Sequence, residues 1–247
     1  MIHISLHPEE LFRIAGFAVT NSIIVSVVLL MLFVAGGMVL RRKLALIPAG
    51  VQNVAETALE GLIELMDQVL GDRRKSEKYL PLVATIFMFV LLSNWLGLLP
   101  GIGSIVFHNG AESAPLLRSP STDLNFTLAL AIISVLSINL IGIATLGLIP
   151  HLKKFFDFRS PIQFFVGMLE LISEFVRIIS FSFRLFGNIF AGEVLLVVIQ
   201  FLIPYILPVP FVMMEMFVGL IQAFIFAMLT LVFISVATEH SEENTEH

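Results

Sequence analysis

Three stretches of this chain contain no charged residue, and each is long enough as a helix to cross a membrane. They cover residues 14–40, 79–99 and 124–149. A helix of about 20 apolar residues crosses the hydrocarbon core of a bilayer, which is about 30 Å thick. Because lipid offers no partner to backbone polar groups, a spanning segment must satisfy them internally. The three runs therefore predict an all-α membrane protein.

Two further apolar segments cover 161–203 and 211–238, and Pro204, Pro208 and Pro210 separate them. Proline interrupts a helix, so the two segments form a hairpin. A helix over 161–203 is about 64 Å long at 1.5 Å per residue, about twice the thickness of the hydrocarbon core. Since ordinary spans tilt by about 20°, we expect a long, steeply tilted hairpin.

The remaining segments are polar. In 51–70, Glu56, Glu60 and Glu64 recur at helical spacing beside apolar residues, which predicts an amphipathic interfacial helix. Residues 239–247 form an acidic, polar tail. We expect about five membrane-embedded helices plus the amphipathic helix over 51–70, in a single integral membrane domain over 1–247.

Composition excludes several classes of protein. Only 13% of the residues are charged and the mean hydropathy is +0.98, whereas a soluble domain has about 25% charged residues. The chain has no cysteine, and it contains neither a phosphate-binding loop nor an H-E-x-x-H metal motif. We expect no enzymatic activity in this chain alone, no cofactor, no metal and no nucleic acid partner.

Lys and Arg gather at 41–43, 73–78 and 153–159. Alternating spans place all three clusters on one side, which is cytoplasmic by the positive-inside rule. The N-terminus is then outside and the C-terminus cytoplasmic.

The segment 161–203 carries ionisable residues where lipid disfavours them. At 100° per residue, five side chains share a stripe about 80° wide: Glu170, Glu174, Arg177, Arg184 and Asn188. Ser173 and Ser180 border it. Because a charge exposed to lipid costs several kcal/mol, the stripe faces protein or water.

The two arginines of the stripe differ. Arg177 lies one turn from Glu174, so the two form a structural ion pair. Arg184 has no acidic neighbour one turn away, and its guanidinium does not deprotonate. It requires a carboxylate from Glu193, from Glu215 or from another chain, or else a hydrated cavity.

A second polar zone lies on the opposite face of the same segment. Glu193 and Gln200 share that face, and Glu215 and Gln222 share a face of the next helix. Facing helices would make these four residues a polar seam. Buried polar groups also serve as structural contacts in helical bundles, so the charges alone leave several classes open: an ion-coupled secondary transporter, a structural scaffold, or the stator of an ion-driven motor.

At these residues the chain resembles a known family. Ser182-Phe-Arg184-Leu-Phe-Gly-Asn188-Ile-Phe-Ala-Gly-Glu193 resembles the signature of subunit a of F-type ATP synthases. The segments Asn94-Trp-Leu-Gly-Leu-Leu-Pro100-Gly101, Pro120-Ser-Thr-Asp123-Leu-Asn125 and Leu220-Ile-Gln222-Ala-Phe are also similar to that family.

The resemblance implies proton translocation by a stationary subunit, coupled to ATP synthesis on other subunits. Two half-channels then deliver protons to and from the carboxylates of a rotating c-subunit ring. Arg184 corresponds to the family's essential arginine, an electrostatic gate that faces the ring carboxylate. Asn188, Glu193, Glu215 and Gln222 correspond to the outer half-channel, and Glu170, Ser173 and Ser180 to the inner one.

The resemblance also implies partners and a compartment. The partners are the c-ring, the peripheral-stalk subunit b, other ATP synthase subunits, membrane lipid and protons, with protons favoured over sodium. The membrane is a bacterial inner membrane, with the mitochondrial inner membrane as the alternative. Some members carry His where this chain has Glu215, so the family leaves the pH dependence open.

Overall fold

The computed structural model describes residues 10–14, 17–42, 45, 50–99, 106–109, 112–115, 118–155, 160–204 and 206–239. Five of its helices are long and apolar enough to span a membrane. The helices are α1 (Asn21–Arg42), α2 (Val51–Leu70), α3 (Arg73–Leu96), α4 (Leu124–Leu146), α5 (Leu148–Phe155), α6 (Pro161–Leu202) and α7 (Pro208–Glu239). The predicted helical membrane fold is confirmed, while residues 240–247 of the expected tail lie outside the described residues.

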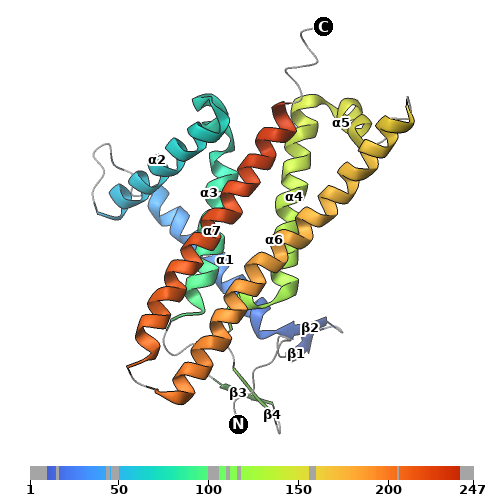
Figure 1. Ribbon diagram of the computed structural model, residues 1–247. Helices are drawn as coiled ribbons and strands as arrows, with labels where there is room; N and C mark the ends of the chain where they lie inside the picture. Colours follow the sequence, from blue (N-terminus) through green and yellow to red (C-terminus); the bar gives the residue numbers. More distant parts are fainter. Residues whose placement is uncertain are drawn as a thin grey trace.

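Two short β-hairpins were not predicted. β1 (Glu10–Ile14) pairs with β2 (Phe17–Thr20), and β3 (Val106–Asn109) pairs with β4 (Glu112–Pro115), both antiparallel. The first hairpin takes up the start of the uncharged run 14–40, so α1 begins at Asn21. Figure 1 shows these hairpins at one end of the molecule, with α2 and α5 at the other. We call these the β-hairpin end and the α2–α5 end.

The corner between α2 and α3 follows from three residues. Gly71 ends α2 in the left-handed region, with φ 67°, which glycine adopts without a steric penalty. The next residue, Asp72, accepts a hydrogen bond from the Arg74 amide and caps α3. The helix therefore starts in the charged turn before residue 79. On α2 the buried apolar side chains are Leu62, Ile63 and Met66, and the acidic face is largely exposed.

Asp123 starts α4 by accepting from the Asn125 amide, and its carboxylate also accepts from Ser22 of α1. Gly147, with φ 87°, ends α4 before the last residues of the predicted span. The basic segment that follows forms α5, a helix of 8 residues that the sequence analysis did not predict.

The last two helices form the expected hairpin. Ser160 caps α6, and Pro161 occupies its first turn, where proline costs no hydrogen bond. Pro208 and Pro210 lie in the first turn of α7 for the same reason, so α7 begins before residue 211. The 42 residues of α6 run unbroken for about 63 Å at 1.5 Å per residue. Figure 1 shows α6 crossing the bundle obliquely relative to α4.

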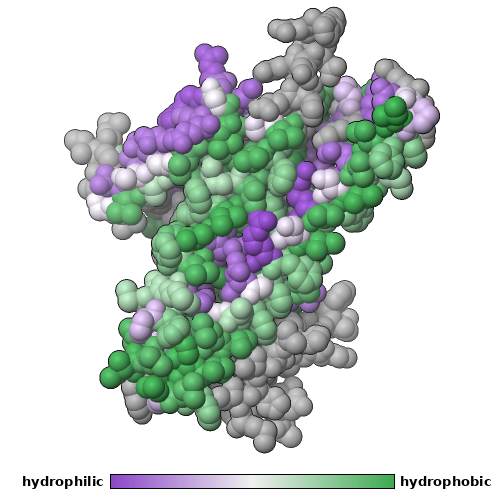
Figure 2. All heavy atoms as spheres, viewed as in Figure 1, coloured by the Kyte–Doolittle hydropathy of each residue, from purple (hydrophilic) through white to green (hydrophobic). Residues whose placement is uncertain are grey.

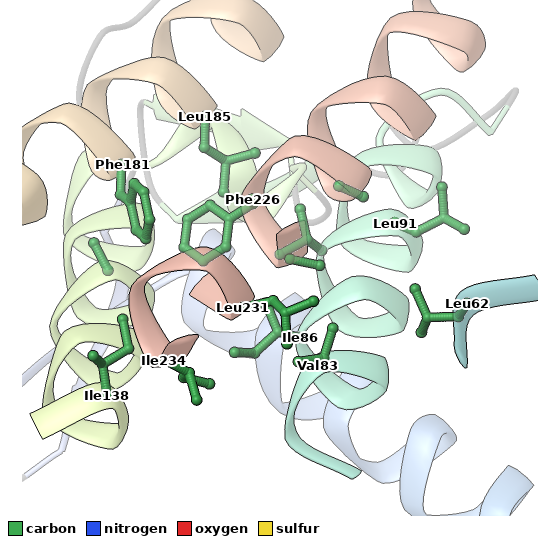
Figure 3. Packing of buried hydrophobic residues seen from close by; sticks show 14 of the residues in the cluster. Leu62, Val83, Ile86, Leu91, Ile138, Phe181, Leu185, Phe226, Leu231 and Ile234 are labelled. Atoms are coloured by element: carbon green, nitrogen blue, oxygen red, sulfur yellow. The ribbon is translucent and has the colours of Figure 1, made fainter. Parts of the chain in front are cut away.

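The core lies where α3, α4, α6 and α7 meet (Figure 3). Phe181 and Leu185 of α6 pack near Phe226 of α7, whose more distant turns contribute Leu231 and Ile234. Two buried hydroxyl pairs join the same helices: Thr127 with Ser182 at 3.1 Å and Ser134 with Thr230 at 2.8 Å. Such pairs fix the contacts between helices without placing a charge in the interior.

Candidate functional site

Arg184 lies about half-way along α6. Figure 2 shows hydrophilic residues in the middle of an otherwise largely hydrophobic face of the molecule. The Arg184 side chain is half-buried, and its Nη2 donates to Ser180 Oγ at 3.4 Å. No carboxylate of the described residues forms an ion pair with it. Neither Glu193 nor Glu215 supplies the missing partner.

One turn further along α6, Asn188 reaches α7. Its Nδ2 donates to Gln222 Oε1 at 2.8 Å, which joins the arginine stripe to the second polar zone. Gln222 is 2% exposed, and its Nε2 is buried without a hydrogen-bond partner among the described residues. A buried amide donor without a partner is uncommon, so this position suits a water molecule or another transient acceptor.

Gly192 of α6 and Glu215 of α7 lie in contact where the two helices cross. A Cβ atom at Gly192 would overlap the carboxylate of Glu215, so a larger residue here would displace the end of that side chain. Glu215 is 5% exposed and forms no hydrogen bond or ion pair with the described residues. Glu193 follows Gly192 directly, and its Oε2 is buried with no partner in the described part of the chain. Gln200, the other residue of the expected seam, is exposed.

The α3 helix fixes the position of α7 at this crossing. Asn94 Nδ2 donates to the carbonyl of Gly219 at 3.0 Å, and Trp95 Nε1 donates to the carbonyl of Met216 at 2.9 Å. Both acceptors lie within one turn of Glu215. The polar end of α3, similar to the family's Asn-Trp segment, therefore holds the helix that carries this carboxylate.

Nearer the α2–α5 end, α6 carries the pair that the sequence predicts. Arg177 Nη1 lies 2.9 Å from Glu174 Oε1, and the two side chains are 11% and 15% exposed. The guanidinium stacks over Phe233 of α7, 3.8 Å from the ring centroid. Glu170 is half-buried and Ser173 is exposed on the same part of α6.

Two residues near this pair were missed by the sequence analysis. Asn139 of α4 donates to Glu174 Oε2 at 3.4 Å, and its Oδ1 lies 3.1 Å from His151 Nε2 of α5. An uncharged asparagine in an apolar run and a histidine just beyond it gave no pattern that connects them to Glu174. No group of three His, Asp or Glu in the described ranges could hold a metal ion.

Comparison with known proteins agrees with this geometry. The family model described as "ATP synthase A chain" matches residues 19–235. The chain is 32% identical to ATP synthase subunit a of Moorella thermoacetica over 235 residues, 95% of this chain and 97% of the relative. It is 39% identical to ATP synthase subunit a of Campylobacter jejuni subsp. doylei over 204 residues, 81% and 82% of the two chains. The chain therefore belongs to the family of ATP synthase subunit a, the non-catalytic, multi-pass membrane subunit through which the Fo sector translocates protons.

Proposed function

We propose that this chain carries protons through two half-channels to and from the carboxylates of a rotating c-subunit ring, coupled to ATP synthesis on other subunits. The observation that carries the proposal is the uncompensated guanidinium of Arg184 half-way along a membrane helix. A cation in that place requires an acid or a hydrated cavity, and no described residue of this chain provides the acid. A ring carboxylate would provide it in turn as each ring subunit passes.

Arg184 then works as an electrostatic gate. It never releases its own proton, so it carries none between the half-channels. Its charge favours the ionised form of the passing carboxylate, which therefore gives up its proton on one side and takes up another after a rotation. The exposed apolar residues of α6 around Arg184, such as Phe183 at 56% and Ile179 at 53%, suit contact with the apolar wall of a ring.

The outer half-channel uses Asn188, Glu193, Glu215 and Gln222, which lie together where α6 crosses α7. Neither carboxylate forms an ion pair with the described residues, and Glu193 Oε2 and Gln222 Nε2 are buried there without a hydrogen-bond partner. Proton exchange along such a path requires acceptors of this kind.

The inner half-channel uses Glu170, Ser173 and Ser180, on the part of α6 nearer the α2–α5 end. This end carries Arg41, Arg73 and Lys153, which makes it the cytoplasmic side by the positive-inside rule. The N-terminus is then outside and the C-terminus cytoplasmic. The host membrane is a bacterial plasma membrane, the chain forms one membrane domain, and peripheral-stalk subunit b is a further partner.

The test measures passive proton flux and ATP synthesis in liposomes that contain the complete ATP synthase, with wild-type chain, Arg184→Ala or Arg184→Lys. We expect Arg184→Ala to leak protons without making ATP, because the gate between the half-channels is lost. Arg184→Lys keeps the charge without the planar fork and serves as the matched control for loss of charge. Wild-type ATP synthesis by Arg184→Ala would contradict the proposal.

A further inference from the structure

A polar chain crosses three helices at the inner part of α6. It runs from His151 of α5 through Asn139 of α4 to Glu174 and Arg177 of α6, and Arg177 ends over Phe233 of α7. Its members come from segments far apart in the sequence, and none of them has a part in the two half-channels described above. The chain therefore requires its own explanation.

The direction of each hydrogen bond follows from Asn139. Its Nδ2 donates to the Val135 carbonyl at 2.9 Å and to Glu174 Oε2 at 3.4 Å, and both of these atoms only accept. The opposite amide orientation would place an oxygen against two acceptors, so Oδ1 must face His151. Because Oδ1 accepts, His151 Nε2 carries the proton of this bond.

Packing holds the imidazole in place. His151 is 5% exposed, and its ring meets Phe155 edge-on with centroids 5.6 Å apart. A Cβ atom at Gly142 of α4 would lie 3.0 Å from His151 Cε1 and 3.1 Å from Nδ1. The absence of a side chain at Gly142 thus provides the room for the imidazole, which packs closely between Gly142 and Phe155.

Arg177 lies on nearly the same face of α6 as Arg184, two turns away, or about 10 Å along the helix. Glu174 neutralises Arg177, while Arg184 forms no ion pair with the described residues. An un-neutralised Arg177 would present a second cation to a ring carboxylate that passes this face. A gate with two competing cations would hold that carboxylate at the wrong position.

We propose that His151 and Asn139 are positioning residues that hold the Glu174 carboxylate on Arg177, so that Arg184 alone acts on the ring carboxylate. The inference rests on the proposed function, because it presupposes a passing carboxylate. His151 acts here as a hydrogen-bond donor to Asn139. Another neutral hydrogen-bond donor of similar reach is therefore expected to take over its role.

The experiment uses the complete ATP synthase in membrane vesicles and measures ATP synthesis driven by a proton gradient, with co-purification of the ring as the assay of assembly. The variants are His151→Leu, His151→Gln, Glu174→Gln and the double variant His151→Leu, Glu174→Gln. We expect His151→Leu to be about three- to tenfold slower, the effect of one lost hydrogen bond. His151→Gln keeps the donor and stays within about twofold of wild type. The double variant is no slower than Glu174→Gln alone, because both changes break the same chain.

Three results would overturn the inference: a wild-type rate for His151→Leu, a rate for His151→Gln as low as that of His151→Leu, or additive losses in the double variant. If His151→Leu fails to assemble, Gly142→Ala replaces it, because its methyl group presses on the imidazole. Gly61→Ala of α2, whose Cβ meets nothing within 4 Å, is the matched control. Equal rates for the two alanine variants would then overturn it. Arg184→Ala in the same assay tests the proposed function separately.

Discussion

Buried carboxylates lie in two regions along α6, and their surroundings differ in opposite ways. At the crossing with α7, Glu215 is 5% exposed and forms no ion pair with the described residues, and Glu193 Oε2 is buried without a partner there. Near the α2–α5 end, Glu174 accepts hydrogen bonds from both Arg177 and Asn139. Glutamate carboxylates thus lack hydrogen-bond or ionic partners among the described residues at the crossing, and Glu174 has both kinds of partner near the α2–α5 end.

The difference indicates two kinds of work. A group that exchanges protons must be able to exist in charged and neutral forms, and a fixed cation at its side would hold it ionised. A buried group that only supports the fold needs that cation, since an uncompensated charge is costly. The crossing region therefore suits proton exchange, and the Glu174 region suits a constant structure.

The largest expected effect concerns the region of Glu174 and Arg177, near the α2–α5 end. Arg177→Gln leaves the Glu174 carboxylate in place without its cation, and breaking one partner of a buried pair costs about 3–5 kcal/mol. We expect the thermal unfolding temperature of the complex to fall accordingly. The control is the double variant Glu174→Gln, Arg177→Gln, which removes both charges and recovers most of the loss. Equal unfolding temperatures for the single and double variants would show that this pair is no different from an exposed one.

At the crossing of α6 and α7 we expect the opposite effect of a substitution on thermal stability. Glu215→Gln keeps the shape of the side chain and removes a buried carboxylate with no partner among the described residues. We expect proton flux to fall about 100-fold, the lower range for loss of an acid–base group, while thermal stability is unchanged or higher. Glu64→Gln on the exposed face of α2 is the matched control. A clear loss of stability with normal flux would assign Glu215 a structural role.

Gly192 tests whether the close crossing itself matters. Gly192→Ala places a methyl group on the Glu215 carboxylate, and overpacking of this kind costs about 1–3 kcal/mol. We expect a slower proton flux with a smaller loss of stability than Arg177→Gln produces. Gly36→Ala in α1, where a Cβ meets nothing within 4 Å, measures the effect of alanine in a helix alone. Identical behaviour of the two variants would mean that the Glu215 side chain moves aside from Gly192 at little cost.

The helical fold follows from sequence because lipid imposes a simple rule on length and hydropathy. The uncharged runs and the prolines between 204 and 210 predict all five spans, and helical periodicity places Glu174 beside Arg177. The short hairpins and α5 were missed because they are brief, and because length and hydropathy assigned the start of the run 14–40 and the end of the run 124–149 to the membrane spans. Side-chain neighbours from different helices, such as Asn139 and His151, depend on how the helices pack, and no spacing along one helix reports that.

Arg184 also shows what the charges alone left open. An uncompensated arginine fits a transporter or a motor stator, and its position in the structure does not distinguish them. Membership in the subunit a family decides against the transporter and the scaffold. The family implies the missing carboxylate, and the described residues agree, because none of their acids pairs with Arg184.

The smallest expected effect comes from an exposed Arg–carboxylate contact at the corner between α2 and α3. Arg73 Nη1 lies 2.9 Å from Asp67 Oδ2, with side chains 51% and 31% exposed. Hydrogen bonds from Ser76 and Arg73 lower the pKa of Asp67 below its ordinary value of 3.8. A carboxylate with a lowered folded-state pKa adds stability above its unfolded pKa, and that stability is lost as the pH falls through the folded one.

We therefore expect amide hydrogen exchange at the end of α2 to accelerate only below about pH 4, and expect Asp67→Asn to remove most of that pH dependence. Salt screens exposed ion pairs much more than buried ones, and the Debye length is about 3 Å at 1 M salt. We therefore expect 1 M salt to weaken the Asp67–Arg73 ion pair and to leave the Glu174–Arg177 ion pair unchanged. Glu60→Gln on the same helix is the control. Equal salt sensitivity at both pairs would mean that water reaches Glu174 as freely as Asp67, and the contrast between the two regions of α6 would then have to rest on hydrogen bonding alone.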